Sequence, residues 1–365
     1  MRTGIAEMPL HYSRAPTWLF QRMKRLAGAV AEAVVLDEGT AGLLARLSDP
    51  HWFQAFGCVL GFDWHSSGLT TTACGALKEG LAGREEELGL FVTGGKGATS
   101  RKTPAEIATW GERTGIEPDP LVYASRTSAK VDSAAVQDGY QIYHHVFLFD
   151  REARWAVVQQ GMNEENGMAR RYHWLGEKVE DFVCEPHAAV CCDARGETLN
   201  LVARESEGAR QGSAEVARQA PERTVAEIDR LRTLALPRRH EVELADVNPK
   251  RLASIFLKTY DAQPAGFEDL LGLAGVGAKT LRALSLLAEL VYGCAPSTED
   301  PARFSFAHGG KDGTPFPVQR AVYDRSIATL EKAIRSAKLG QAQELAAFKR
   351  LARAFPANTA PNRAG

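Results

Sequence analysis

The chain has 365 residues, with 44 Lys and Arg against 45 Asp and Glu, and 44% of its residues are hydrophobic. This composition excludes a disordered, collagen-like or small disulfide-stabilised protein, and the length suffices for two or more hydrophobic cores. The formal net charge is −1. Any binding to nucleic acid must therefore come from a local basic patch, because the chain has no overall positive field to attract phosphate.

No stretch approaches about eighteen consecutive apolar residues, so no membrane span is expected. The N-terminus lacks the order of a signal peptide, which predicts a cytoplasmic protein. The six cysteines include no CxxC pair. This pattern fits neither a zinc site nor a disulfide framework, so we interpret the cysteines as small buried residues.

Hydrophobic periodicity predicts the elements of the first part of the chain. It indicates a helix over residues 16–36 and two further helices on either side of the loop GFDWHSSG, residues 61–68. A short strand, ELGLFVT, then runs into a glycine-rich loop. A capping-box pattern begins another helix at Thr103. Residues 119–138 predict a helix that stops at the following glycine.

A β-hairpin is predicted from the segments YQIYHHVFLFD and RWAVVQQGM, which are rich in aromatic and β-branched residues. A turn centred near Glu152 places His145 opposite Gln159. The same register places His144 opposite Gln160. Polar side chains are therefore expected on both faces of this sheet.

The composition predicts the domain organisation. Residues 204–240 combine charges and alanines with few large apolar residues, which is typical of an exposed helical connector. We expect an α/β candidate catalytic domain over residues 1–203 before this connector, a helical domain over 241–350 after it, and a disordered tail over 351–365. The predicted fold class is mixed α/β, mostly helical with a small β-sheet.

The most specific motif is FEDLLGLAGVGAKTLRALSLLAELVYG, residues 267–293, which predicts two apolar helices joined by a glycine hairpin. This pattern resembles a helix-hairpin-helix. Glycines let such a turn approach a DNA phosphate, and the first amides of the second helix point at that phosphate. The residues expected to contact DNA are Gly275, Val276, Gly277, Lys279, Thr280 and Arg282. The alternative is a helix pair whose glycines only permit tight packing.

Asp63 and His65 stand two positions apart in the loop GFDWHSSG, ahead of a helix N-terminus. Such a pair can hold a divalent metal or orient a water molecule, and the helix N-terminus favours an anion nearby. This arrangement suits phosphate chemistry. The alternative is an aspartate that caps a helix and a histidine that packs on Trp52 or Trp64.

Carboxylates, cations and histidines also gather in residues 125–145. A nuclease needs carboxylates for Mg²⁺ or Mn²⁺, a cation for the transferring phosphoryl group and a base. The expected metal ligands are Asp63, Asp132 and Asp138. The expected catalytic residues are Asp63, His65, Lys130 (or Arg126), Asp132 and His145. The alternative is a hydrogen-bonded scaffold of Asp, His and Gln that ties a helix to the sheet.

Two basic segments, GGKGATSRK at 94–102 and ARRYHW at 169–174, extend the predicted DNA surface. Their glycines allow close approach to phosphate, and Tyr172 or Trp174 could stack on a base. The basic residues expected to contact DNA are Lys96, Arg101, Lys102, Arg170 and Arg171. Taken singly, each segment also fits a solvated loop or a salt-bridged surface.

Several strings together resemble the prokaryotic domain-of-unknown-function family 763. They are MRTGIAEMPLH, GFDWHSSG, VDSAAVQDGYQIYHH, WAVVQQGMN, ARRYHWL, LLGLAGVGAKTLRALSLLAELVYG and RFSFAHGGKDGTPFPV, spread over most of residues 1–340. The resemblance implies a DNA-associated protein of bacteria or archaea with a helix-hairpin-helix near its C-terminus, and more loosely a nuclease. The resemblance assigns no catalytic residues to this chain.

These observations favour a metal-dependent nuclease that selects DNA by structure rather than by base sequence, with Mg²⁺ or Mn²⁺ as cofactor. A second interpretation is a non-catalytic DNA-binding protein for repair intermediates or nucleoid architecture. A third is an RNA-processing factor, because backbone recognition by a hairpin also suits RNA. The expected partner is DNA and not a membrane, and self-association into a homo-oligomer stays open.

Overall fold

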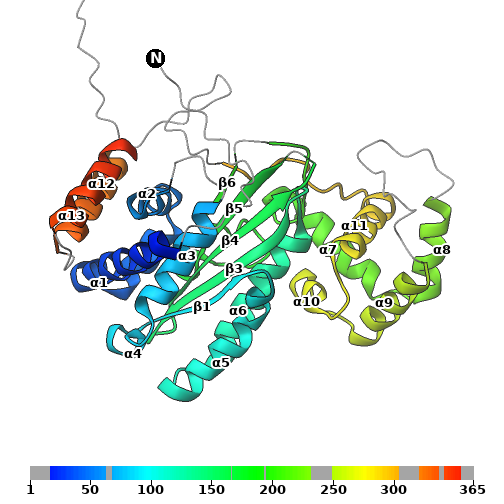
Figure 1. The fold of residues 1–365 in the computed structure, drawn as a ribbon. Helices are drawn as coiled ribbons and strands as arrows, with labels where there is room; N and C mark the ends of the chain where they lie inside the picture. Colours follow the sequence, from blue (N-terminus) through cyan, green and yellow to red (C-terminus); the bar gives the residue numbers. More distant parts are fainter. Residues whose placement is uncertain are drawn as a thin grey trace, which may run out of the picture.

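A five-stranded antiparallel sheet forms the centre of the fold, and helices cover both of its faces (Figure 1). The structure is a computed structural model that describes residues 17–62, 68–165, 167–192, 195–231, 249–303, 320–336 and 341–354. The mixed α/β class predicted from the sequence is confirmed. Within the described residues, none of the helices is long and apolar enough to cross a membrane.

The strand order of the central sheet is β1-β3-β4-β5-β6. These strands span Leu90–Lys96, Gln141–Asp150, Trp155–Asn163, Met168–Leu175 and Ala189–Cys191. A small second sheet pairs β2 (Val136–Gln137) with β7 (Leu199–Asn200).

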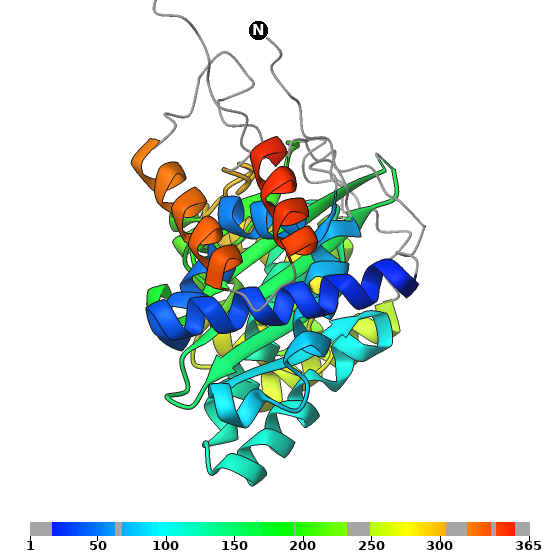
Figure 2. The ribbon, with the colours of Figure 1, turned by 60° about the vertical axis from the view of Figure 1, so that its left-hand side comes forward.

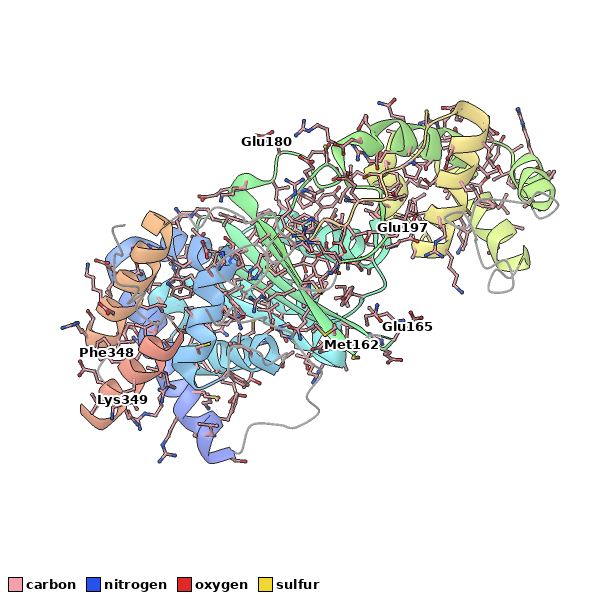
Figure 3. All side chains as sticks on the ribbon, turned by 90° about the horizontal axis from the view of Figure 1, so that it is seen from above. Met162, Glu165, Glu180, Glu197, Phe348 and Lys349 are labelled. Carbon is pink, nitrogen blue, oxygen red and sulfur yellow. The ribbon has the colours of Figure 1, made fainter. Side chains whose placement is uncertain are left out.

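The predicted register of the β3–β4 hairpin is confirmed. His145 pairs with Gln159, and His144 pairs with Gln160. The next strand, β5, falls on the segment ARRYHW, for which the sequence predicted no strand. The turn between β4 and β5 projects from the edge of the molecule, where Met162 and Glu165 lie (Figure 3).

Helices α1 (Thr17–Ser48), α2 (Pro50–Leu60) and α3 (Gly68–Leu81) cover one face of the sheet. Their buried side chains share a core with the strand residues Leu90, Val92, Val146, Leu148, Ala156, Val158 and Leu175. Helix α1 crosses the strands and packs closely on α3 (Figure 2). A Cβ at Gly28 would lie 2.5 Å from the carbonyl oxygen of Gly80, so the approach of these two helices requires glycine.

On the opposite face, α5 (Thr103–Thr114) and α6 (Pro118–Lys130) lie against the sheet. The layer continues beyond α6 with α7 (Glu207–Ala217), α10 (Phe267–Gly272) and α11 (Ala278–Tyr292), as Figure 1 shows. Their core includes the strand residues Phe91, Phe147, Phe149, Val157 and Trp174. This core continues from the sheet to α11. The helix-hairpin-helix therefore packs against the N-terminal part of the chain and has no separate core of its own.

The segment expected to be an exposed connector is folded into this layer as far as the structure describes it. It contains α7 and α8 (Pro221–Leu231), and α7 packs along α11. Ala209 and Ser213 are buried, and a Cβ at Gly212 would lie 2.7 Å from the Cβ of Ala288. The expectation of exposure was wrong for α7, because its small residues permit close helix packing.

The last described helices pack on the same side of the sheet as α1, α2 and α3. Helices α12 (Arg320–Ser336) and α13 (Gln341–Ala354) pack on α1 and α2, on the side of the sheet away from α9 (Pro249–Ala262) to α11 (Figures 1 and 3). Leu330 and Ile334 are buried in the core of that layer. Residues 241–350 therefore do not form one packing unit. The predicted tail begins inside α13, and residues 355–365 lie outside the described residues.

Two predicted helix ends differ in the structure. Helix α5 starts at Thr103, but Glu106 accepts hydrogen bonds from the Gly94 amide and the Lys78 ammonium and so does not complete a capping box. Helix α6 ends at Lys130 and continues as a single-turn π-helix, η2 (Val131–Ala135), before β2 begins.

Candidate nucleic-acid interface

The predicted helix-hairpin-helix is formed by α10, a glycine turn and α11 (Figure 1). Val276 anchors the turn, with 1% of its surface exposed. Gly275 has a φ of +94°, a conformation that favours glycine. Gly277 is extended and precedes α11, and a Cβ there would meet nothing within 4 Å. The turn therefore packs on one side and offers its backbone to solvent on the other.

The start of α11 is positive. Its first residues read AKTL, and Lys279 and Arg282 are exposed while Thr280 is buried. The first amides of a helix have no acceptor within the helix, and the helix dipole favours an anion at this end. This arrangement can bind a phosphate by backbone amides and two nearby cations.

The inner side of the hairpin is held by residues at the end of α6 and in β2. The Lys130 ammonium donates a hydrogen bond to the carbonyl of Val276. The Gln137 amide nitrogen donates to the Ala278 carbonyl at 2.8 Å. Burial lowers the pKa of Lys130. Lys130 was expected to stabilise a phosphoryl group, and the structure places it instead on the backbone of the hairpin.

Asp132 lies at the centre of a buried polar network between α6 and the sheet. It is 0% exposed and accepts hydrogen bonds from Gln159 Nε2 at 2.5 Å, Trp174 Nε1 at 3.0 Å and His187 Nε2 at 2.5 Å. The carboxylate oxygens are thus occupied by protein donors.

The network extends from Gln159 to His145 and Ser125. Because the Gln159 amide nitrogen donates to Asp132, its Oε1 accepts from His145 Nδ1, at 2.9 Å. Burial lowers the pKa of His145, which keeps the imidazole neutral. Its Nε2 therefore accepts from the Ser125 hydroxyl, at 2.9 Å. This geometry is that of the scaffold alternative, in which Asp, His and Gln tie a helix to the sheet.

Asp138 belongs to a second buried cluster. It pairs with Arg170 at 2.8 Å and accepts from the Tyr172 hydroxyl at 2.6 Å. Arg170 also pairs with Asp300 at 2.7 Å. Burial raises the pKa of Asp138, and the Arg170 charge acts in the opposite direction. Across the described residues, no group of three or more His, Cys, Asp or Glu could hold a metal ion.

Arg170 and Arg171 do not reach the surface. Their exposed fractions are 1% and 0%. Arg171 lies under α2, where it donates to Gln54 at 3.0 Å and lies over the Phe53 ring. The two arginines point to opposite faces because they are neighbours on a strand that is covered on both sides. The expectation that they contact DNA was therefore wrong. Tyr172 and Trp174 are buried as well and cannot stack on a base.

The other predicted site residues fall into two groups. Lys96, Arg101 and Lys102 are exposed at the end of β1 and in the 3₁₀ turn after it, as a phosphate contact requires. Asp63 and His65 lie outside the described residues, between the end of α2 and the start of α3.

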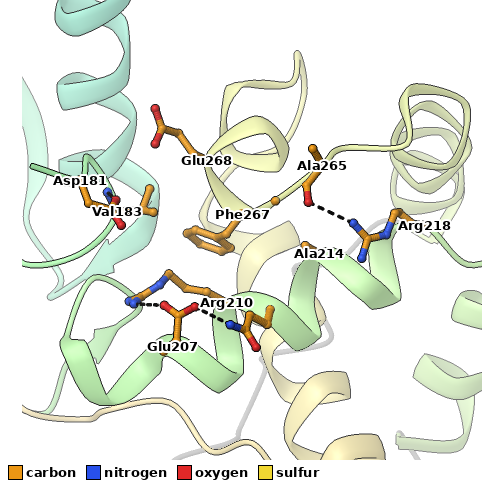
Figure 4. Close-up of a pocket in the computed structure, with 11 residues that line it drawn as sticks. Asp181, Val183, Glu207, Arg210, Ala214, Arg218, Ala265, Phe267 and Glu268 are labelled. Atoms are coloured by element: carbon orange, nitrogen blue, oxygen red, sulfur yellow. Dashed lines mark hydrogen bonds and ion pairs between the residues drawn. The ribbon is translucent and has the colours of Figure 1, made fainter.

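A cavity of about 330 Å³ lies near the hairpin, between α7 and α10 (Figure 4). In its wall, Arg210 pairs with Glu207 at 2.6 Å and Arg218 donates to the carbonyl of Ala265 at 3.3 Å. Both arginines thus bond to protein oxygens, and the cavity is not the cationic site that a phosphate would need.

The family model described as "Protein of unknown function (DUF763)" matches residues 4–318. The chain belongs to this family. Comparison with curated proteins found no match, and comparison with solved structures found none either. The hairpin and the buried network both lie within the segment that matches DUF763.

The structure places two residues of this DUF763 chain in the buried network and at the hairpin that the sequence analysis did not single out. His187 lies in the loop before β6, and Gln137 follows η2. Neither stands in a local pattern that indicates its partner. Gln159 was predicted to lie opposite His145, and that pairing is the signal that could have located the network.

Proposed function

We propose that this protein binds DNA through its helix-hairpin-helix, by contacts to the phosphate backbone that do not depend on base sequence. The supporting observation is the turn itself, in which buried Val276 anchors the hairpin while the backbone around Gly275 and Gly277 faces solvent. Lys279 and Arg282 add charge beside the first amides of α11. Backbone amides and cations together suit a phosphate.

Metal-dependent cleavage of DNA has less support from the described residues. The side chains of Asp132, Asp138 and His145 are buried and bonded to protein partners. A metal site would have to draw on Asp63 and His65, the remaining members of the set expected from the sequence. We therefore favour DNA binding, the second interpretation of the sequence, as the proposed function.

Glycine substitutions test the proposal. Gly277→Ala adds a methyl group to the open edge of the turn at an ordinary φ, so we expect weaker duplex binding in a protein of native stability. A tenfold loss of affinity corresponds to about 1.4 kcal/mol. The measurement is fluorescence anisotropy with a labelled DNA duplex.

Gly196→Ala is the matched control, because it makes the same chemical change at a glycine with open space around it that lies outside the helix-hairpin-helix, before β7. We expect it to bind DNA like the wild-type protein. If Gly277→Ala binds as tightly as Gly196→Ala, the hairpin is not the phosphate site and the proposal is wrong.

A further inference from the structure

One side chain from outside the hairpin bonds to both its backbone and one of its basic groups. Gln137 Nε2 donates to the carbonyls of Ala134, at 3.0 Å, and Ala278, at 2.8 Å. Gln137 Oε1 accepts from Arg282 Nε at 2.8 Å. The single amide thus joins η2, the start of α11 and the guanidinium of Arg282.

The bond from Arg282 Nε fixes the plane of an otherwise exposed guanidinium. A free arginine side chain has many rotamers, and a phosphate contact must overcome the entropy lost when that side chain is ordered. Holding the side chain before DNA arrives removes part of that cost. The two terminal nitrogens of the guanidinium match the oxygens of a phosphate.

The chemical type of residue 137 suits this role. A glutamine accepts from Arg282 without neutralising its charge, and its NH₂ group satisfies the Ala278 carbonyl at the same time. A glutamate could not donate to that carbonyl and would place a negative charge beside the phosphate site.

We propose that Gln137 is a positioning residue of the DNA-binding hairpin, which orients Arg282 toward a backbone phosphate. This inference rests on the proposed function. Lys130 supports the same arrangement by bonding to Val276, two residues before Ala278. The α6–η2–β2 segment of the N-terminal part therefore helps to set the affinity of a motif more than 100 residues away.

A double-mutant cycle tests the role of Gln137. Duplex affinity is measured by anisotropy over a salt series for the wild type, Gln137→Leu, Arg282→Gln and the double variant. Arg282→Gln should reduce the slope of log affinity against log salt by about 0.9, the value for one duplex phosphate. Gln137→Leu should weaken binding about fivefold, or about 1 kcal/mol, and reduce the same slope. In the Arg282→Gln background, Gln137→Leu should change the affinity less than about twofold.

Two substitutions serve as matched controls. Gln211→Leu removes an exposed glutamine amide on α7 that bonds to Glu207, and Arg113→Gln removes an exposed arginine that pairs with Glu86 on α4 (Glu85–Leu88). Both should bind DNA with unchanged affinity. If Gln137→Leu does not fold, as judged by circular dichroism, Gln137→Glu keeps the side-chain shape and should still weaken binding.

The outcomes separate the two proposals. If Gly277→Ala and Arg282→Gln weaken binding but Gln137→Leu and Gln137→Glu do not, the positioning role is overturned while DNA binding by the hairpin stands. The positioning role is also overturned if Gln137→Leu lowers the duplex affinity equally in the wild-type and Arg282→Gln backgrounds. Gln137 would then act only on the structure of the hairpin. If the wild-type protein does not bind duplex DNA, both proposals are overturned.

Discussion

Substitutions of Asp132 test whether the buried network around its carboxylate is structural or catalytic. Asp132→Ala removes the acceptor of three buried donors, on Gln159, Trp174 and His187. Asp132→Asn keeps the shape and one oxygen but replaces the other oxygen with a donor. Each variant therefore has a different expected loss of stability.

The size of the loss follows from the number of donors. A buried donor without an acceptor costs about 1–3 kcal/mol, so three donors cost about 3–9 kcal/mol. The His187 side chain keeps 7% of its surface exposed, so water can replace part of its lost bond, and the expected loss for Asp132→Ala is about 4 kcal/mol. In Asp132→Asn, His187 can change tautomer and accept from the new NH₂ group. The expected loss is then only about 1–2 kcal/mol.

Urea unfolding followed by tryptophan fluorescence measures both losses, and Trp174 is itself part of the network. A carboxylate kept for chemistry commonly reduces stability, so its removal leaves stability unchanged or raises it. If Asp132→Ala is as stable as the wild type, the structural account of this network is refuted. A functional role for Asp132 then becomes the better explanation.

Three further predictions concern salt, metal and pH. The logarithm of duplex affinity should fall linearly with the logarithm of salt concentration, by about 0.9 per neutralised phosphate; a slope near zero in anisotropy titrations would exclude phosphate contacts. If Asp63 holds a metal, Asp63→Asn should abolish chelator-sensitive cleavage of duplex or branched DNA while leaving affinity in chelator unchanged; cleavage at the wild-type rate would remove Asp63 from the site. The free energy of unfolding should fall as the pH drops below about 6.5, the pKa of an unfolded histidine. Burial lowers the pKa of His144 to about 3, so the unfolded chain takes up a proton there that the folded chain does not. His144→Leu should weaken this pH dependence in urea titrations, because it removes the titrating group. Within the described part of the chain the substitution breaks no hydrogen bond, since neither ring nitrogen of His144 has a partner there; an unchanged pH profile would contradict the assignment.

The sequence by itself determined the features that depend on neighbouring residues. The β3–β4 register follows from alternation on either side of a short turn, so the pairing of His145 with Gln159 can be predicted from the order of residues alone. The helix-hairpin-helix follows from glycines between two apolar periodic segments, and the structure has helices on both sides of that turn. In each case, the information lies within about 25 residues of chain.

Only the tertiary structure decided which polar groups are buried and which residues they contact. ARRYHW has the composition of a basic surface, but strands and helices that lie far away in the sequence cover both faces of β5, so Arg170 and Arg171 are buried. Helix α7 has the composition of a connector, yet α11 covers it. Gln137 and Arg282 are 145 residues apart. Local patterns cannot indicate such contacts, because the packing of the whole chain determines which distant groups meet and which lose their water.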